Sequence, residues 1–343
     1  MGNELFALTK PAAVNGRQAQ LDLRHRVATG IRRAGHHIVA DENGPFVNAL
    51  MKSGGASAFA ALVDGNEQFV RDTPSERIAA YDAMAPDAVF VACSDSRASM
   101  PIATRRTPDN SKVLWIRTAG LAIGDMVAES LAQLHENYPN AIFGVASHSS
   151  KGPVTPEAML LAEQIGALTG MQALLAYYNI AINELRFLLC DSNTNMPDGD
   201  REAIQRLTTD LKTGNALFVA SIAGSDELQA HMNRIAGTQT PQVMVVSDCG
   251  LIPPELLFSQ TVPGGLFVAS YMFDSSSGSP AHIPDCAIIG SAEYGILHLG
   301  TPLTVILGKT QAQAVKIAAD LAEGSPAVLQ AVQQGKTTVV AGE

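Results

Sequence analysis

A short apolar run ends in a serine and an aspartate at residues 89–95, VFVACSD. A run of the same kind returns at residues 243–248, VMVVSD. Upstream of each run, and separated from it by a stretch with helical spacing, stands the pattern LxxGNxxFV, at residues 62–70 and again at residues 211–219. Because these landmarks recur in the same order, they indicate an internal repeat.

More elements follow each run in matching order: a second apolar run, a helical stretch and a third apolar run. In the first set they are residues 113–116, 126–137 and 141–146, and in the second set residues 266–269, 287–299 and 303–308. Short, continuously apolar strands separated by helices are typical of a parallel sheet covered on both faces. We therefore predict two tandem α/β units, residues 56–200 and 201–343, preceded by an N-terminal extension, residues 1–55.

Composition excludes several classes of protein. The 343 residues include 33 acidic and 23 Lys and Arg side chains, a formal charge of −10, which disfavours binding to a nucleic-acid backbone. With 46% hydrophobic and 16% charged residues, the chain has a composition that argues against disorder and is compatible with a further homo-oligomer. No uncharged apolar run reaches the length of about 18 residues that a transmembrane helix needs, so no membrane partner is expected.

The four cysteines are spread singly, without a CxxC pair: Cys93, Cys190, Cys249 and Cys286. This spacing excludes a zinc ribbon and a thioredoxin motif. It is also too sparse for a disulfide-stapled secreted fold, and the first residues lack the basic flank of a signal peptide. We expect a reducing, cytoplasmic location.

Chemically active side chains follow the first and third predicted strands. Cys93, Asp95 and Arg97 stand at alternating positions after the first strand, and His148 follows the third. Ligands of doubly wound sheets gather at the carboxyl ends of the strands. Taken singly, a strand-end cysteine, a surface ion pair and a loop histidine need no function. At one shared edge they predict a Cys/His metal site beside a charge-assisted Asp–Arg pair.

These residues resemble the β-carbonic anhydrases, whose pattern is CxDxR, then RNAGN, then a helix near SLEYA, then HxxCG. The matching residues of the first unit are 93–97 (CSDSR), 117–120 (RTAG), 129–131 (ESL) and His148. Those of the second unit are 247–248 (SD), 253–258 (PPELLF), 265–268 (GLFV) and 291–295 (SAEYG). The resemblance covers nearly all of residues 56–343.

The resemblance implies a fold and an activity. The fold would be two tandem β-carbonic-anhydrase-like repeats, each a mainly parallel sheet flanked by helices, packed as an intrachain pseudo-dimer. The activity would be that of a lyase, a zinc-dependent carbonate dehydratase that converts CO2 and water to bicarbonate. Cys93 and His148 would bind zinc, Asp95 would accept a hydrogen bond from the reacting water, and Arg97 would hold Asp95.

The chain departs from the family pattern at the ligands. Lys151 stands where the family has its second cysteine, and a protonated lysine has no lone pair for a metal. In the second repeat, only Asp248 is retained. The Cys, Arg, His and second Cys positions there hold Val246, Gly250, Lys309 and Ala312. We therefore expect a partly retained metal site in repeat 1 and none in repeat 2.

Several interpretations of repeat 1 stay open. The third zinc ligand would be Asp95, or Cys190 if the strand that it ends lies beside the third strand, or less readily Cys249. Alternatively, Lys151 replaces the metal by pairing with Asp95 or Cys93, so that the pocket takes bicarbonate or another small anion. In a last alternative the pocket is vestigial and Lys151 is a surface residue. The zinc interpretations predict CO2 hydration, at a low or gated rate if Asp95 is the ligand because it would then block the water. The others predict a catalytically inactive pseudo-enzyme that binds a small anion or serves as a structural, assembly subunit.

Overall fold

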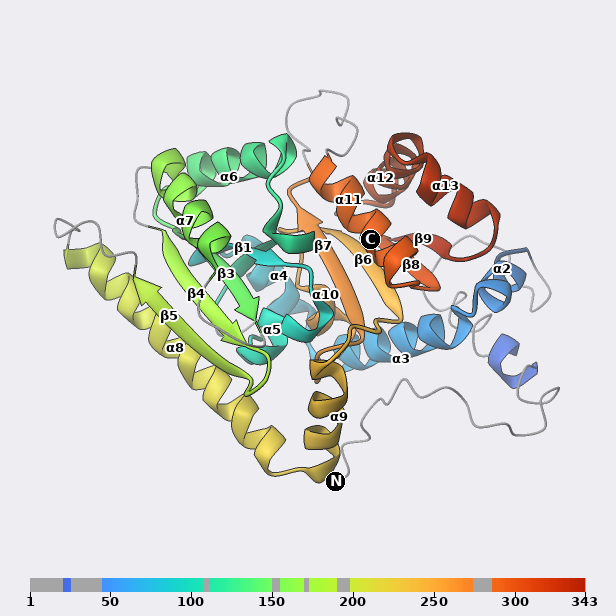
Figure 1. Ribbon diagram of the computed structural model, residues 1–343, viewed down its shortest axis with the longest axis horizontal. Helices are drawn as coiled ribbons and strands as arrows, with labels where there is room; N and C mark the ends of the chain where they lie inside the picture. The colour runs from blue at the N-terminus through green and yellow to red at the C-terminus, as the bar shows by residue number, and fades with distance from the viewer. Residues whose placement is uncertain are drawn as a thin grey trace.

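A nine-stranded sheet forms the centre of the protein, in the order β5-β4-β3-β1-β2-β7-β6-β8-β9 (Figure 1). The computed structural model describes residues 21–25, 45–107, 111–149, 155–169, 173–189, 198–273 and 286–342. The strands are β1 Ala88–Cys93, β2 Val113–Thr118, β3 Ile142–Ser149, β4 Leu174–Asn179, β5 Glu184–Leu189, β6 Val243–Asp248, β7 Leu266–Tyr271, β8 Leu303–Leu307 and β9 Thr338–Gly342.

The strand order is the same on either side of the sheet centre. β1 lies between β2 and β3, and β4 follows outside; β6 lies between β7 and β8, and β9 follows outside. These pairs are all parallel. β2 and β7 meet antiparallel at the centre, with Arg117 opposite Ser270. The exception to this correspondence is β5, which pairs antiparallel with β4 and has no equivalent beside β9 in the described residues.

Helices cover both faces of the sheet (Figure 1). The longer ones are α2 Pro45–Ser53, α3 Ala56–Asp72, α4 Ser75–Ala83, α6 Asp125–Asn137, α7 Pro156–Thr169, α8 Asp198–Ala223, α9 Asp226–Ala236, α11 Cys286–Glu293, α12 Gln311–Gly324 and α13 Pro326–Gln333. The short ones are α5 Met100–Ala103 and α10 Pro254–Leu257. None of these helices is both long and apolar enough to span a membrane.

Two helices cross from one half of the chain to the other. The apolar face of α3, including Phe59 and Leu62, packs on β6, β7 and β8 of the second half. That of α8, including Leu211 and Phe218, packs on β1, β3 and β4 of the first half. In each helix, the glycine of the LxxGNxxFV pattern therefore lies against the other half of the chain.

A glycine allows each close approach. A Cβ atom at Gly65 would lie 2.2 Å from the carbonyl oxygen of Phe258, directly after α10. One at Gly214 would lie 1.9 Å from the carbonyl oxygen of Thr104, directly after α5. Both distances are too short for any residue with a side chain, so glycine is required at both positions.

The structure confirms the α/β class and the mainly parallel sheet. Each predicted apolar run forms a strand, and each is buried on both faces as such runs are in parallel sheets. One strand was not predicted from the sequence, since α7 ends at Thr169 and β4 begins at Leu174. A short buried apolar run has no periodicity that distinguishes a strand from a helix.

Candidate functional site

The first-half site lies at the carboxyl ends of β1 and β3. These parallel neighbours are in register, with Ala92 opposite Ala146, so Cys93 at the end of β1 and His148 near the end of β3 come together. A side-chain hydrogen bond joins the Cys93 thiol to the His148 ring. The two residues therefore share one edge of the sheet, as the sequence predicted.

Asp95 is held in place by Arg97. The Asp95 carboxylate accepts the Arg97 backbone N–H at 2.9 Å, which begins a 3-10 turn over residues 96–98. The Arg97 guanidinium donates through Nε to Oδ1 at 3.0 Å and through Nη2 to Oδ2 at 2.6 Å. Since Asp95 is only 3% exposed, this two-point pairing compensates a buried charge.

The second half of the chain supports this pair. Arg97 Nη1 donates to the carbonyl oxygen of Ala236 in α9 at 3.3 Å. The backbone N–H of Gly264 donates to the carbonyl oxygen of Ser96 at 2.8 Å. The first-half site is therefore completed by segments from both halves.

Cys93, His148 and Asp95 form one electrostatic unit. His148 Nε2 lies 3.6 Å from Asp95 Oδ2. Burial alone would raise the pKa of the Cys93 thiol, but the hydrogen bond and the charge of His148 lower this pKa below its ordinary value. Burial opposes protonation of His148, but the Cys93 hydrogen bond and the nearby acidic groups raise the pKa of the ring. Cys93 and His148 thus each favour the charged form of the other.

The donor set fits zinc in part. A thiolate and an imidazole are ordinary zinc ligands, and a catalytic site uses three protein ligands. Within the described residues, no three Cys, His, Asp or Glu side chains form a group that could hold a metal ion. Asp95 is the nearest acidic group, but both of its oxygens accept hydrogen bonds from Arg97. The described residues therefore supply two ligands and do not complete a zinc centre.

Two other residues were predicted for this site from the sequence. Lys151 and Cys190 lie outside the described residues. Cys190 was a candidate ligand only if the strand before it lies beside β3, and that condition is not met, since β3 pairs with β1 and β4. β5 is antiparallel, and Leu189 lies opposite Leu174, at the end of the sheet away from His148. β4, which was not predicted from the sequence, lies between β3 and β5.

The corresponding edge of the second half holds an ion pair. Asp248 is fully buried and accepts the backbone N–H groups of Gly250 at 2.7 Å and Phe273 at 3.1 Å. Lys309 Nζ lies 3.6 Å from its Oδ1. Burial raises the pKa of Asp248, and the lysine and the backbone donors only partly oppose this rise. Val246 occupies the place of Cys93 and Ala312 is exposed on α12.

Gly250 and Lys309 depend on each other. A Cβ at Gly250 would lie 3.0 Å from Asp248 Oδ1 and 3.3 Å from Lys309 Nζ, so an arginine there would displace the lysine. The register of β6 and β8 places Leu307, rather than Lys309, opposite Ser247 at the position matching His148. Lys309 reaches the aspartate because its side chain is long.

A buried ion pair that was not predicted from the sequence joins the two halves. Arg117 of β2 donates to Glu255 of α10, and Ser99 Oγ donates to the same carboxylate oxygen at 2.8 Å. Arg117 and Glu255 are 2% and 1% exposed. Both stood in quoted motifs, RTAG and PPELLF, but nothing in either motif indicates that the two face each other.

Comparison with known proteins gives a partial relationship. No protein-family model matches the chain. The chain is 36% identical over 109 residues to a carbonic anhydrase of Mycolicibacterium smegmatis, a match that covers 31% of this chain and 48% of that protein. The match thus spans about half the length of the curated relative. The chain is therefore similar, over part of its length, to a carbonic anhydrase.

Proposed function

We propose that this protein is carbonic-anhydrase-like and hydrates CO2 to bicarbonate at the first-half site. The observation that carries the proposal is the meeting of two pairs, Cys93 with His148 and Asp95 with Arg97, at one edge of the sheet. The partial identity to a carbonic anhydrase supports it independently. Lyase activity and CO2 or bicarbonate as ligands belong to the same proposal.

Each residue has a role in this scheme. Cys93 and His148 would hold zinc, and Asp95 would be the third ligand only if it were released from Arg97. Zinc, when bound, would lower the pKa of a water molecule to near neutrality. Arg97 fixes both oxygens of Asp95 and keeps one of them 3.6 Å from His148. From there Asp95 accepts a hydrogen bond from the reacting water and orients its lone pair towards CO2.

We also propose that the chain is a tandem duplication packed as an intrachain pseudo-dimer, with units at residues 56–200 and 201–343 after an extension, residues 1–55. The matching strand order about the β2–β7 pair supports this, as do the exchanged helices α3 and α8. The second unit would be a scaffold without metal. Its ends of β6 and β8 supply one carboxylate and one ammonium group, a pair that cannot bind zinc as the first unit would.

A second candidate is a small-anion-binding pseudo-enzyme with a structural role. It is favoured by the incomplete ligand set of the described residues and by the pairing of Cys93 with His148. A thiol and an imidazole that satisfy each other need no metal. In this case the imidazolium and Arg97 would attract bicarbonate, and no hydration would follow. A cytoplasmic location and a further homo-oligomer remain predictions under both candidates.

Stopped-flow CO2 hydration by the full chain tests the proposal. Wild type and Cys249→Ala should accelerate hydration alike, because Cys249 is buried in the core cluster beneath α6 and α7 and is therefore no longer a candidate for the third ligand. Cys93→Ser should lose at least about 100-fold, the cost expected for removing a principal catalytic interaction. Hydration at the uncatalysed rate in wild type, or an unchanged rate in Cys93→Ser, would overturn the proposal and favour the anion-binding candidate.

A further inference from the structure

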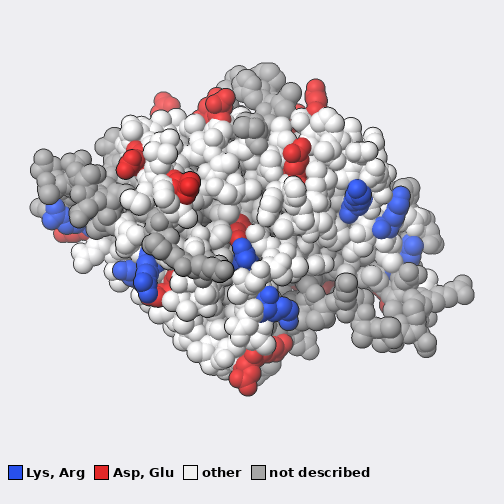
Figure 2. Space-filling view, viewed as in Figure 1, with Lys and Arg blue, Asp and Glu red and all other residues white. Residues whose placement is uncertain are grey.

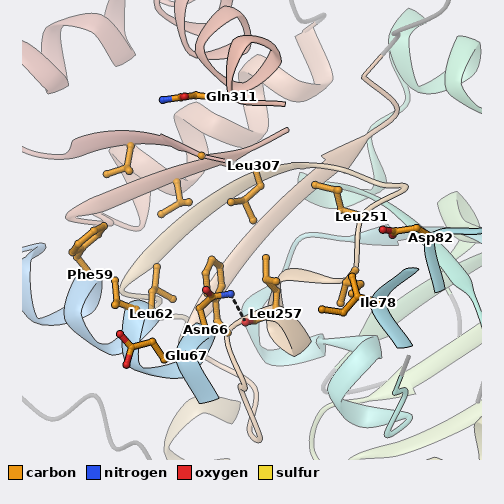
Figure 3. Close-up of a pocket in the computed structure, with 16 residues that line it drawn as sticks. Phe59, Leu62, Asn66, Glu67, Ile78, Asp82, Leu251, Leu257, Leu307 and Gln311 are labelled. Carbon is orange, nitrogen blue, oxygen red and sulfur yellow. Dashed lines mark hydrogen bonds between the residues drawn. The ribbon is translucent and has the colours of Figure 1, made fainter. Parts of the chain in front are cut away.

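Two hollows of opposite character adjoin the strands of the second half. The larger one, of about 360 Å³, lies between α3 and the outer strands β8 and β9, and apolar side chains such as Leu62 and Leu307 line most of it (Figure 3). The Asn66 amide in its wall donates to the carbonyl oxygen of Leu257 at 3.3 Å. The smaller one, of about 10 Å³, lies at the centre of the sheet beside α10. Of these two, and within the described residues, only the smaller one is walled by buried side-chain atoms that have no hydrogen-bond partner.

The small hollow lies where the two halves of the sheet meet. The registers of β6, β7 and β2 put Ser247, Ser270 and Arg117 in one row across these three strands. Trp115 stands two residues before Arg117 in β2, so its side chain lies on the same face of the sheet. Glu255 of α10 covers this row and pairs with Arg117. Because two of the three residues in the row are serines, their small side chains leave a space beside the ion pair.

Four atoms in the wall of this hollow lack a hydrogen-bond partner in the part of the chain that the structure describes. They are Trp115 Nε1, Arg117 Nη2, Ser247 Oγ and Glu255 Oε2. None of the four residues is more than 5% exposed. Leaving a buried polar group unpaired is costly, so folded proteins pair nearly all such groups, with ordered water where no protein group is in reach. The four atoms therefore call for a common partner inside the hollow.

Their chemistry selects that partner. Trp115 Nε1 and Arg117 Nη2 can only donate a hydrogen bond, the Glu255 carboxylate can only accept one, and the Ser247 hydroxyl can do either. A water molecule accepts two hydrogen bonds and donates two, which matches this set. A metal cation or an ammonium ion has no lone pair for the two donors, and an anion such as bicarbonate would be repelled by the carboxylate. The size agrees, because about 10 Å³ is the space that one water molecule requires.

We propose that one bound water molecule is an integral part of the contact between the two halves. It accepts hydrogen bonds from Trp115 and Arg117 of the first half and donates to Ser247 and Glu255 of the second half. A buried ion pair stabilises a fold only when its remaining protons and lone pairs are also bonded. The water meets this condition, because it pairs the second Arg117 nitrogen and the second Glu255 oxygen, which the direct contact leaves free.

The tryptophan makes this site observable, because Trp115 is the single tryptophan of the chain. NMR spectroscopy of the full-length protein should therefore contain one indole N–H resonance, which needs no assignment by mutagenesis. In wild type we expect a nuclear Overhauser cross-peak between this N–H and water, with the sign of the cross-peaks within the protein. That sign is characteristic of a water that stays bound while the protein tumbles, rather than of surface hydration.

Two substitutions at one position separate the bound water from its neighbours. Ser247→Val removes an acceptor and fills the hollow with methyl groups, so the cross-peak should be lost; valine suits a buried strand. Ser247→Ala is the matched control. It removes the same hydroxyl but keeps the space and leaves three partners, Trp115, Arg117 and Glu255, which suffice to hold a buried water. The cross-peak should therefore remain in Ser247→Ala.

The contrary results are distinct. An indole N–H without a water cross-peak in wild type would overturn the proposal, and so would a cross-peak that persists in Ser247→Val. Loss of the cross-peak in Ser247→Ala would show that exchange through the Ser247 hydroxyl produced it, which also overturns the proposal. A high-resolution crystal structure of the full chain is an independent check. One spherical density peak within hydrogen-bond distance of all four atoms would support the bound water, and density for a larger anion, or none, would overturn it. None of these outcomes depends on zinc or on CO2 hydration.

Discussion

The two halves of the sheet share a topology and differ at both ends of it. At the carboxyl ends of the inner strands, the first half has a thiol, an imidazole and a carboxylate, while the second half has a buried Asp248 beside Lys309. At the outer edges, β5 closes the first half, and a hollow adjoins β9 in the second. The comparison shows that the same topology accommodates different side chains at its strand ends. The core strands, and the two helices that pack across the halves, stabilise the fold in both cases.

Charged residues make up only 16% of the chain. In Figure 2 acidic and basic groups are scattered over the visible face and do not gather into a broad basic patch. The charged groups that organise the molecule are mostly buried, as Arg117 and Glu255 are between the halves. The strongest tests of the comparison therefore address the contacts that join the halves.

Breaking the buried ion pair should have the largest effect on stability. Arg117→Met leaves Glu255 charged and unpaired, which should lower the free energy of unfolding by about 3–5 kcal/mol. Adding Glu255→Met should restore much of this loss. The exposed pair Arg186–Glu184 is the control, because Arg186→Met should cost less than about 1 kcal/mol. Urea unfolding measures both variants. Equal losses of unfolding free energy for Arg117→Met and Arg186→Met would contradict the conclusion that the Arg117–Glu255 ion pair holds the two halves together.

The next largest effect on stability should come from adding a side chain at the two glycines where α3 and α8 contact the other half. Gly65→Ala and Gly214→Ala each force a Cβ against a carbonyl oxygen of the other half, and overpacking of this kind costs about 1–3 kcal/mol or more. Gly237→Ala is the matched control, since its Cβ would meet nothing within 4 Å. Thermal unfolding of the three variants measures the difference. If Gly65→Ala and Gly214→Ala unfold like Gly237→Ala, the crossed packing is wrong.

The two asparagines of the repeated LxxGNxxFV pattern, Asn66 and Asn215, should differ in how much they stabilise the fold. Asn215→Ala leaves two buried carbonyl groups and one N–H without a partner, a loss of about 1–3 kcal/mol. Asn66→Ala removes one longer hydrogen bond and should cost about 0.5–1.5 kcal/mol. Equilibrium unfolding of both variants ranks the two sites. A larger cost at Asn66 would contradict the account that Asn215, with three hydrogen bonds, stabilises its half more than Asn66, with one, stabilises the other.

The smallest expected effect is a pH dependence at Asp248. Because burial raises the pKa of Asp248 in the folded protein, its protonated form stabilises the fold below the ordinary carboxyl pKa of about 3.9. That contribution is lost as the pH rises through the raised pKa. The free energy of unfolding of wild type minus that of Asp248→Asn should therefore decrease with increasing pH from about pH 4. A difference that stays constant or increases with pH would contradict the conclusion that burial raises the pKa of Asp248.

Much of the fold follows from residues 62–70, 89–95 and their recurrences, since buried parallel strands leave continuous apolar runs. The strand ends also predicted that Cys93 and His148 meet. Three features had no signal in the sequence. β4 is too short and too apolar to show a period, the contact of Arg117 with Glu255 joins distant motifs, and the exchange of α3 and α8 depends on tertiary packing alone.

Zinc content tests the central claim most directly, because that claim is the chemical difference between the two sheet edges. Elemental mass spectrometry of untagged, chelator-free protein should find about one zinc per chain in wild type and in Cys249→Ala, and none in Cys93→Ser. Zinc that persists in Cys93→Ser would contradict the assignment of the site. No zinc in wild type would contradict metal-dependent hydration and leave a carbonic-anhydrase-like scaffold that binds a small anion.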